Sequence, residues 1–545
     1  DHLEPVLTPL AVDPARPFPV LANRLIHIAV RIAGTKGGPK HALVSVPGGP
    51  RLVALPGEAG RWTTTDHIVQ AHLGSLFPGY TVEALTRFRV TRDGSLDIDE
   101  ETASDLLSEI EQELSSRDHG EPVRLEVAGD GDESLATWLR TVMGLEVADC
   151  FSIDGPLDLT LLFALTDRVD RADLRDVPMP PRRFPSEEDW EDPFAYLRDR
   201  ELLLHHPFQG FAPVVELVQR AAADPQVLAI KQTLYRVSGD SPLVRALIDA
   251  VRAGKQVTVL IELKARFDEA ANIRWARRLE EAGAHVVYGL VGYKVHAKLL
   301  MVIRRDRDGI RRYIHLGTGN YNDKTARLYT DLSYFTTNEA IGRDVAALFN
   351  MLTGYSEPPR WERLAVAPLT LRPSFVQWIR HEADLARAGK GGHIIAKFNS
   401  LVDFAIVDEL YAASQAGVEI DLIVRGMCIL RPGVPGLSEN IRVRSLIGRF
   451  LEHHRIYWFA NRESATSEPI VATASADWMS RNLDRRVECL VRIEAPPLRD
   501  RLKALLDAAL ADNTQARVMD SDGTYRRLSP RGRQKPVSAM AAWME

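Results

Sequence analysis

The sequence predicts an α/β protein. An N-terminal α+β head domain over residues 1–181 precedes two α/β domains, over residues 182–363 and 364–545, that are related by internal duplication. Two observations lead to this prediction. Proline clusters near residues 177–190 and 356–373 would end any helix or strand, so they mark domain boundaries. The segments after the two clusters are similar in length and carry strand–helix–strand units in the same order, which indicates a repeat.

Length and composition are those of a globular protein. At 545 residues the chain has room for roughly three to four domains. Its residues are 45% hydrophobic and 26% charged, and a net charge of −6 is not that of a polycation built for nucleic acid. We find no signal peptide and no apolar run of about 18 residues, so no membrane span is expected.

The chain has three cysteines, Cys150, Cys428 and Cys489, and no two of them have the spacing of a metal or redox motif. Sparse cysteine of this kind is typical of a reducing compartment. We therefore expect a cytoplasmic protein without a disulfide framework or a zinc site made of cysteines.

The head domain combines strand and helix patterns. Residues 21–32 end as a strand, and residues 87–94 form another that closes in an Asp-Gly turn. Residues 101–116 place leucine and isoleucine at helical spacing, which predicts an amphipathic helix. These patterns indicate an α+β domain and point to no particular chemistry.

The first copy of the repeat starts with an expected strand over Val227–Arg236. Ser241 and Pro242 then supply the N-cap and the first residue of a helix, which Gly254 closes. The next strand is expected over Val257–Leu263. Two strands joined by a helix through short loops imply a parallel pair with a right-handed crossover.

The second copy repeats this order, with expected strands at residues 394–400 and 420–424 around a helix that Gly417 closes. In the first copy the Asp308-Gly309 pair also predicts a hairpin, which adds an antiparallel strand to each otherwise parallel sheet. Two mixed α/β domains of common descent are the result.

The segment Gly292–Ile303 carries the most informative pattern of the first copy. It is expected to be one β-strand with His296 and Lys298 on the same face, since side chains alternate with a period of two. An imidazole and an ammonium emerging together from an apolar strand are costly in a core. They suit a site where a neutral imidazole attacks an anion that the neighbouring cation holds.

The second copy has a matching segment, Phe450–Phe459, with His453 and Arg455 in the corresponding places. Each segment is followed by a turn of small residues and asparagine, Gly317–Asn320 and Ser475–Asn482. A single histidine in a strand is usually structural, but recurrence with a cation two residues later favours function at both sites. We expect the two histidines to face each other across one site.

Duplicated domains that each carry His-x-Lys or His-x-Arg and a later asparagine resemble the phospholipase D superfamily. In that superfamily one histidine attacks phosphorus and the other serves the leaving group as a general acid. Two positions depart from its pattern: Ile303 replaces an aspartate five residues after the lysine, and Arg455 replaces a lysine. These departures disfavour a simple phosphodiesterase.

The chain more closely resembles the polyphosphate kinase family of the long bacterial type, over essentially its whole length. The matching segments are Leu7–Pro14, His205–Phe208, Ala229–Arg236, Glu262–Glu269, Val295–Lys298, Leu316–Asn322, Phe398–Ser400, Ile423–Cys428, Leu451–His453 and Ser475–Met479. The family also has an N-terminal helical domain. Residue 1 falls just after it, so we expect a fragment that lacks this domain.

This resemblance implies reversible transfer of the terminal phosphoryl group of ATP to inorganic polyphosphate through a phosphohistidine. His296 would be the phosphorylated residue, and His453 would assist as proton donor or as a contact to the phosphate. Tyr329 and Arg425 match positions that bind ATP. The resemblance further implies ATP or ADP and polyphosphate as partners, a homodimer or homotetramer, and peripheral association with a membrane; nucleic acid is not expected.

The resemblance also implies Mg²⁺, because Arg236 and Arg266 match positions at the family's magnesium site. Arginine has no lone pair for a metal, so we expect both to bind phosphates that carry the ion. Cations gather at strand ends near both histidines, namely Lys231, Arg236, Lys264, Arg266, Lys298, Arg425 and Arg455. Asn320 is a candidate for phosphate contact, and Glu262 and Asp477 for holding the imidazole tautomers.

Two other functions stay open at this point: a phosphodiester hydrolase of the phospholipase D type, and a polyanion-binding remnant without catalysis. His454 alternates to the face opposite His453, and we interpret it as structural. His205 and His206 are also expected to be structural or capping residues.

Overall fold

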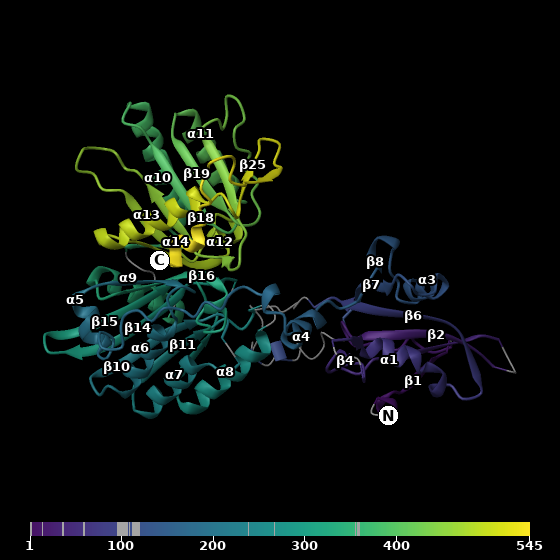
Figure 1. The fold of residues 1–545 in the computed structure, drawn as a ribbon. Coiled ribbons are helices and arrows are strands. Elements are labelled where there is room, and N and C mark those ends of the chain that lie inside the picture. Colours follow the sequence, from purple (N-terminus) through teal and green to yellow (C-terminus); the bar gives the residue numbers. More distant parts are fainter. Residues whose placement is uncertain are drawn as a thin grey trace. The chain divides into compact units, whose positions relative to one another are not determined.

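The computed structural model describes residues 3–13, 15–34, 38–57, 60–94, 107, 110–111, 120–237, 239–265, 268–290, 292–354, 356 and 360–544. It divides into two compact units, Asp1–Val177 and Pro178–Glu545. Figure 1 draws the first unit in purple to blue and the second in blue-green to yellow.

The first unit is an α+β domain built on a six-stranded sheet in the order β1-β3-β2-β6-β7-β8. Neighbouring strands are antiparallel except β7 and β8, which are parallel. The strands are β1 (Pro9–Val12), β2 (Ile26–Gly34), β3 (Lys40–Ser45), β6 (Tyr80–Arg92), β7 (Pro122–Ala128) and β8 (Cys150–Ile153), with a separate pair β4 (Leu52–Ala54) and β5 (Trp62–Thr64). The described helices are α1 (Thr65–Ala71), α3 (Glu133–Val142) and α4 (Leu161–Arg168), with 3-10 turns η1 (Glu4–Val6), η2 (Leu73–Leu76), η4 (Val147–Asp149) and η5 (Ala172–Leu174).

Strand β2 shows why this sheet is covered on both faces. Ile28 and Val30 lie in one apolar cluster with Val69 of α1, whereas Ala29 lies in a second cluster with Leu139 of α3. Alternation along the strand therefore sends successive side chains to helices on opposite sides of the sheet.

Both strands expected in the head domain are confirmed. The one at residues 21–32 is β2, and the one at residues 87–94 is the end of β6. The helix expected over residues 101–116 lies outside the described residues, apart from residues 107, 110 and 111.

The second unit begins with an α/β half whose sheet has the order β12-β11-β10-β14-β15-β16-β9. Strands β10, β11 and β12 are parallel, and the others continue the sheet in antiparallel fashion. The strands are β9 (Leu202–His206), β10 (Val227–Leu234), β11 (Gln256–Ile261), β12 (His285–Tyr288), β14 (Lys298–Asp306), β15 (Gly309–Gly317) and β16 (Tyr329–Thr336). The described helices are α5 (Pro193–Asp199), α6 (Ala212–Ala223), α7 (Pro242–Arg252), α8 (Glu269–Ala282) and α9 (Glu339–Gly354), with the 3-10 turn η6 (Thr325–Arg327).

The other half has a sheet in the order β20-β19-β18-β22-β23-β24-β17, which β25 and β26 extend beyond β20. Its strands are β17 (Leu364–Ala367), β18 (His393–Phe398), β19 (Glu419–Val424), β20 (Ile441–Leu446), β22 (Ile456–Phe459), β23 (Ile470–Ala474), β24 (Arg486–Arg492), β25 (Ala516–Met519) and β26 (Tyr525–Arg527). The described helices are α10 (Leu371–Arg387), α11 (Phe404–Gln415), α12 (Ser480–Asp484), α13 (Pro496–Ala511) and α14 (Ala539–Met544).

The two strand orders correspond strand by strand, so the predicted duplication is confirmed. The helices that join the equivalent parallel strands begin alike. The Ser241 hydroxyl accepts a hydrogen bond from the Val244 amide at 3.4 Å, and the Asp403 carboxylate accepts one from the Ile406 amide at 3.1 Å. The hairpin expected at Asp308-Gly309 joins β14 to β15.

The two histidine segments are not the continuous strands that the pattern predicted. Strand β13 (Lys294–Val295) pairs in parallel with β24 of the other half before the chain enters β14 of its own sheet. The amides of His296 and Ala297 both donate to the Val487 carbonyl, at 2.9 and 3.0 Å. The second copy behaves in the same way, since β21 (Leu451–Glu452) pairs with β16 before the chain continues as β22. Each half therefore contributes one short strand, β13 or β21, to the sheet of the other half. We call these two strands the lent strands.

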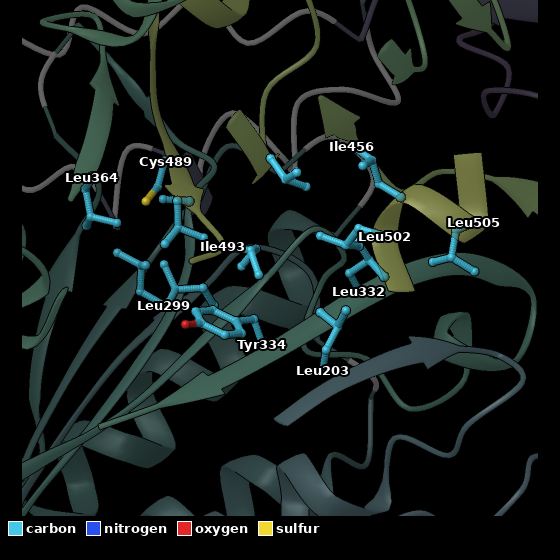
Figure 2. Close-up of a cluster of buried hydrophobic side chains, with 14 of the residues drawn as sticks. Leu203, Leu299, Leu332, Tyr334, Leu364, Ile456, Cys489, Ile493, Leu502 and Leu505 are labelled. Carbon is cyan, nitrogen blue, oxygen red and sulfur yellow. The ribbon is translucent and has the colours of Figure 1, made fainter. Parts of the chain in front are cut away.

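One apolar cluster contains side chains from both halves (Figure 2). Leu299 of β14 and Leu332 of β16 come from the first half, and Ile456 of β22 and Leu502 of α13 come from the second. Burying one such side chain stabilises a fold by about 1.5–3 kcal/mol. Because the cluster is shared, the two halves stabilise each other and hold their common edge in place.

Candidate active site

The two predicted histidines lie where each lent strand returns to its own sheet, and each is held by a carboxylate of the opposite half. Nδ1 of His296 lies 2.9 Å from a carboxylate oxygen of Glu488 on β24. Nδ1 of His453 lies 2.7 Å from Oδ1 of Asp331 on β16. A hydrogen on Nδ1 that is donated to a carboxylate leaves the lone pair on Nε2. Both imidazoles are therefore prepared to react at Nε2.

Burial keeps both imidazoles neutral near pH 7. It lowers the pKa of His296 well below its usual value, and Lys298 and Arg486 lower it further. Burial also lowers the pKa of His453, and the Asp331 carboxylate opposes this only in part. When protonated, His453 would lower the pKa of His296 further, so the protonation of the two rings is coupled.

The residues expected to orient the imidazoles were predicted incorrectly. Glu262 accepts hydrogen bonds from the Val295 amide at 2.8 Å and the Lys264 amide at 3.1 Å, so it fixes the backbone in front of His296. Asp477 accepts from the Asn399 amide at 2.8 Å and from Nε of Arg455 at 3.1 Å. Spacing along one repeat suggested these two residues, whereas the actual partners come from the other repeat.

Sequence reasoning missed Glu488 and Asp331, although a signal was present. Each is the single acidic residue of a largely buried strand, and each strand follows the asparagine-containing turn of its repeat. Both carboxylates are buried. A buried acid at the same place in both copies would have indicated a functional role.

The carboxyl of Glu488 has a pKa close to neutral pH. Burial raises the pKa of its carboxyl to about 7, and Lys298, Arg486 and the Ser475 hydroxyl hold it from rising further. The Ser475 hydroxyl donates to Oε2 of Glu488, and Arg486 lies 3.7 Å from Oε1. The group that orients His296 can therefore change its charge near neutral pH.

Lys298 and Arg455, the two predicted cations of the repeat, are both buried at the centre. The Lys298 ammonium donates to the His296 carbonyl at 2.5 Å. Burial lowers its pKa well below the usual value, while Glu488 and Asp331 act in the opposite direction.

Arg455 joins the two halves. Its Nη1 donates to the Thr318 carbonyl at 3.2 Å and lies 3.4 Å from Nε2 of His453. Burial alone would lower the pKa of the guanidinium, but the carboxylates of Asp477, Asp331 and Glu488 together raise it above the usual value. A permanently charged group therefore lies beside the reactive nitrogen of His453.

The glycine-rich turn also depends on close approach. A Cβ at Gly319 would come within 2.2 Å of Oδ2 of Asp331, so only glycine lets this carboxylate reach its position. The Thr318 hydroxyl donates to Oδ1 of Asp331 at 2.7 Å. In the same turn, Oδ1 of Asn320 is buried and has no hydrogen-bond partner among the described residues, so it is available to a ligand.

Tyr329 and Arg425, expected at the nucleotide, flank the second histidine. The rings of Tyr329 and His453 have centroids 5.4 Å apart. Nε of Arg425 donates to Oδ1 of Asn399 at 2.9 Å, and Nδ2 of Asn399 donates to Oδ1 of Asp477 at 2.9 Å. Burial lowers the pKa of Arg425, opposed by Asp477. The two predicted residues therefore lie on the His453 side of the site.

Of the other predicted cations, Lys231 is not brought into this group, whereas Arg236 lies against Tyr235, whose ring centroid is 4.9 Å from that of His296. The Lys231 ammonium lies 3.4 Å from Oδ1 of Asn350 on α9, and burial alone lowers its pKa, with no contribution from the charges around the histidines. Arg236 forms an ion pair with Asp268 at 2.9 Å and is partly exposed. Arg266 lies outside the described residues.

The described residues fit a metal that arrives with its phosphates. They contain no cluster of three or more histidine, cysteine, aspartate or glutamate side chains suited to a metal ion. Mg²⁺ is usually held through one or two carboxylates and substrate phosphates. Asp268 beside Arg236 offers one carboxylate next to one phosphate-binding cation, which suits that mode.

Comparison with known families is consistent across the chain. The polyphosphate kinase middle domain matches residues 1–165, the polyphosphate kinase C-terminal domain 1 matches residues 192–358, and the C-terminal domain 2 matches residues 364–539. The chain belongs to the polyphosphate kinase family. The resemblance predicted from the motifs is confirmed.

Individual relatives agree. The polyphosphate kinase of Pseudomonas aeruginosa is 44% identical over 553 residues, covering 100% of this chain and 80% of the relative. The polyphosphate kinase of Streptomyces coelicolor is 49% identical over 531 residues, covering 96% and 70%. The crystal structure of polyphosphate kinase from Porphyromonas gingivalis aligns with a TM-score of 0.85 at 32% identity, covering 100% of this chain and 81% of that one.

Two further predictions are settled by these findings. The chain is a kinase, a transferase enzyme of the polyphosphate kinase family. Its fold is a head domain followed by two α/β domains of matching strand order, as the sequence predicted. Of the helices that the structure describes, none is both long and apolar enough to cross a bilayer.

Proposed function

We propose that this chain transfers the terminal phosphoryl group of ATP reversibly to inorganic polyphosphate, through a phosphohistidine at His296. The observation that carries the proposal is the pair of neutral imidazoles, each fixed through Nδ1 by a carboxylate of the opposite half. A neutral imidazole with its lone pair on Nε2 is the form that can attack an electron-poor phosphorus atom.

In the first step Nε2 of His296 attacks the terminal phosphorus of ATP. An N–P bond forms, the P–O bond to the bridging oxygen breaks, and ADP leaves with the electron pair of that bond. In the second step a terminal oxygen of polyphosphate attacks the phosphohistidine, and the electron pair of the N–P bond returns to Nε2. The polymer is longer by one phosphate, and the imidazole is regenerated.

The surrounding cations supply what such a transfer needs most, which is charge neutralisation in a fixed place. Arg455 and Lys298 are both buried, and each lies two residues along the chain from one of the histidines. His453 would contact the moving phosphate, or would act as proton donor after its Nε2 has taken up a proton, and Tyr329 and Arg425 would bind ATP. The Asn320 side chain, whose Oδ1 has no partner among the described residues, would contact phosphate through its Nδ2 donor.

Mg²⁺ is part of the proposal as an ion carried by the phosphates of ATP. When bound it would neutralise phosphate charge. Arg236 would bind a phosphate oxygen, with Asp268 as the neighbouring carboxylate, and Arg266 is predicted to act with it. Lys231 remains a predicted phosphate contact, on the α9 side of the sheet.

The test is incubation of the chain with γ-labelled ATP, followed by acid and base treatment of the protein. Wild type is expected to take up label that is labile in acid and stable in base, as a phosphohistidine is. His296→Ala is expected to take up none, because it lacks the nucleophile. His285→Ala, a change of an exposed histidine on β12, is the matched control and should keep its label.

Label on His296→Ala at an undiminished rate would remove His296 as the nucleophile. Turnover of a phosphodiester without nucleotide would instead favour the hydrolase. Salt-sensitive polyphosphate binding without any transfer would favour the non-catalytic remnant.

Three predictions from the sequence remain alongside this proposal. They are the cytoplasmic location, the assembly as a homodimer or homotetramer with peripheral membrane association, and the domain boundaries at residues 181 and 363. Gel filtration coupled to light scattering measures the second of these directly.

A further inference from the structure

The last helix of the chain, α14, begins at residue 539, where the match to the polyphosphate kinase C-terminal domain 2 ends. It is nevertheless firmly attached. The buried carboxylate of Asp512 accepts a hydrogen bond from the Ala539 amide at 2.8 Å, and Asn513 exchanges two hydrogen bonds with the Val537 backbone, at 2.8 and 3.0 Å. The residues that anchor α14 directly follow α13, so the two helices form one unit.

Trp543 of α14 packs against two histidines that the proposed reaction does not use. Its ring centroid lies 5.3 Å from that of His205 and 5.7 Å from that of His454. The two imidazole centroids are 4.9 Å apart. The three interplanar angles are 76°, 71° and 84°, so every pair meets edge to face. We call these three residues the ring triad.

The ring triad connects separate parts of the fold. His205 belongs to β9 of the first half, His454 follows β21 of the second, and Trp543 comes from the C-terminal helix. Helix α13 reaches the same place, because Arg501 donates to the Leu203 carbonyl at 2.5 Å and to Oε1 of Gln209 at 2.6 Å.

Apolar side chains would cost less free energy than the ring triad at this buried position. Nε2 of His205, both ring nitrogens of His454 and Nε1 of Trp543 are buried without a hydrogen-bond partner among the described residues. Leaving a buried polar group unpaired costs about 1–3 kcal/mol. Edge-to-face packing lets an N–H point at a neighbouring ring, which recovers part of this cost only when the ring geometry is kept.

This geometry acts on the active site because His454 follows His453 directly. His453 is held on one side by Asp331, and its amide donates to the Thr330 hydroxyl at 2.9 Å. On the other side, the peptide between residues 453 and 454 can turn only if the His454 ring moves. A ring fixed between His205 and Trp543 therefore fixes the direction of the His453 side chain.

We propose that the ring triad positions His453, and that Trp543 holds the two imidazoles of the triad in place. The C-terminal helix would then contribute to phosphoryl transfer without touching the substrate. This rests on the proposed function of His453. The residues of the triad are positioning residues, and their loss should affect the chemical step more than nucleotide binding, since a displacement of about 1 Å can cost 10²-fold in rate.

The test compares Trp543→Ala, Trp543→Phe and Met540→Ala in the complete chain. Met540 is the matched control because it lies on the same helix, packs against the same apolar cluster and makes no ring contact with His454. Trp543→Ala is expected to lower kcat about 10- to 100-fold with the KM for ATP within threefold. Trp543→Phe keeps a ring at this place and should restore most of kcat, while Met540→Ala should stay within threefold of wild type.

Two results would overturn the proposal: an unchanged kcat in Trp543→Ala, or an equal loss of kcat in Met540→Ala at the same melting temperature. If Trp543→Ala does not fold, Trp543→Leu, which fills much of the same space without a ring, is measured in its place and must also lower kcat. His453→Gln separates this proposal from the one before. Full activity of His453→Gln contradicts the role of His453, whereas a loss there combined with a normal Trp543→Ala contradicts only the ring triad.

Discussion

Glu488 controls which nitrogen of the His296 imidazole carries the hydrogen. A carboxylate accepts the Nδ1 hydrogen of His296, but a protonated carboxyl holds that tautomer poorly. Because burial raises the pKa of Glu488 to about 7, the group changes from one form to the other within the physiological range. Activity should therefore respond to pH through a residue that never touches the substrate.

A substitution of Glu488 tests whether the ionisation of its carboxyl controls kcat. Glu488→Gln is expected to lower kcat on the order of 10²-fold, since an amide cannot hold the tautomer as a carboxylate does. The rise of kcat with pH through about 7, expected in wild type as Glu488 ionises, should be absent from the variant. The pH profile of kcat measures both. The exposed Glu463→Gln is the control, and a variant profile that still rises near pH 7 would assign the ionisation elsewhere.

The contribution of Glu488 to the free energy of unfolding should change with pH in the direction opposite to kcat, because it falls as the pH rises. The folded state binds the Glu488 proton more tightly than the unfolded state, because the folded pKa is raised. The contribution of this residue to stability is therefore present below the usual pKa of glutamate, near 4.3, and is lost as the pH rises to about 7. In Glu488→Gln this loss should disappear from the pH dependence of unfolding.

Sequence patterns found some of these residues and could not find the others. His296, Lys298, His453 and Arg455 share a local signature that recurs in both copies, so a reader of one chain can recognise them. Glu488 and Asp331 are partners only through contacts between copies, 192 and 122 residues along the chain from their histidines. Spacing within a repeat has no information about such contacts.

At the scale of single elements, the short strand β21, which directly precedes His453, carries one member of an ion pair. Glu452 on β21 lies 2.9 Å from the ammonium of Lys397 on β18; the Lys397 side chain is buried and that of Glu452 is 10% exposed. Burial lowers the pKa of Lys397, and Glu452 opposes it. The ion pair therefore connects β21 to its own half through side chains, while the backbone of β21 pairs with β16 of the first half.

Removal of one partner of the Lys397–Glu452 ion pair should lower the free energy of unfolding. Glu452→Ala leaves the Lys397 ammonium buried without its counter-ion and is expected to destabilise the fold by about 3–5 kcal/mol. The double variant Lys397→Leu with Glu452→Leu should recover most of this loss, because neither charge is then buried. Chemical denaturation measures the free energy of unfolding for each, with the exposed Glu463→Ala as a neutral reference. A loss below about 1 kcal/mol in the single variant would show that water reaches Lys397.

The elements were largely predictable and their pairing was not. Hydrophobic alternation predicted strands at residues 292–303 and 450–459, and both segments are extended over much of these ranges. The break at each histidine arises because the backbone leaves one sheet for another, and the amides of His296 and Ala297 find their acceptor in the opposite half. Alternation records which face is buried and not which sheet supplies the hydrogen bonds.

At the scale of the molecule, the second unit should unfold as one body. Its two halves share an apolar cluster, exchange strands and hold each other's histidines (Figure 2). None of these contacts survives separation of the halves, so each depends on the other for stability. Duplicated domains that merely sit in a row would not be coupled in this way.

Calorimetry tests this coupling. Leu299→Ala, in the shared cluster, is expected to destabilise the second unit by about 2–5 kcal/mol and to move a single transition that includes both halves. Leu43→Ala, equally buried in the first unit, should shift a different transition and serves as the control. Separate transitions for residues 182–363 and 364–545 would contradict the coupling.

The exchange of strands bears on how such a protein could have arisen. An ancestor with one copy would have had a histidine and an acid that do not reach each other, so each subunit of a symmetric pair would have oriented the histidine of its partner. Gene fusion then freed the two copies to diverge, and the glutamate on one side and the aspartate on the other are the trace of that freedom. One ring could become the attacking group and the other its assistant only after the symmetry was lost.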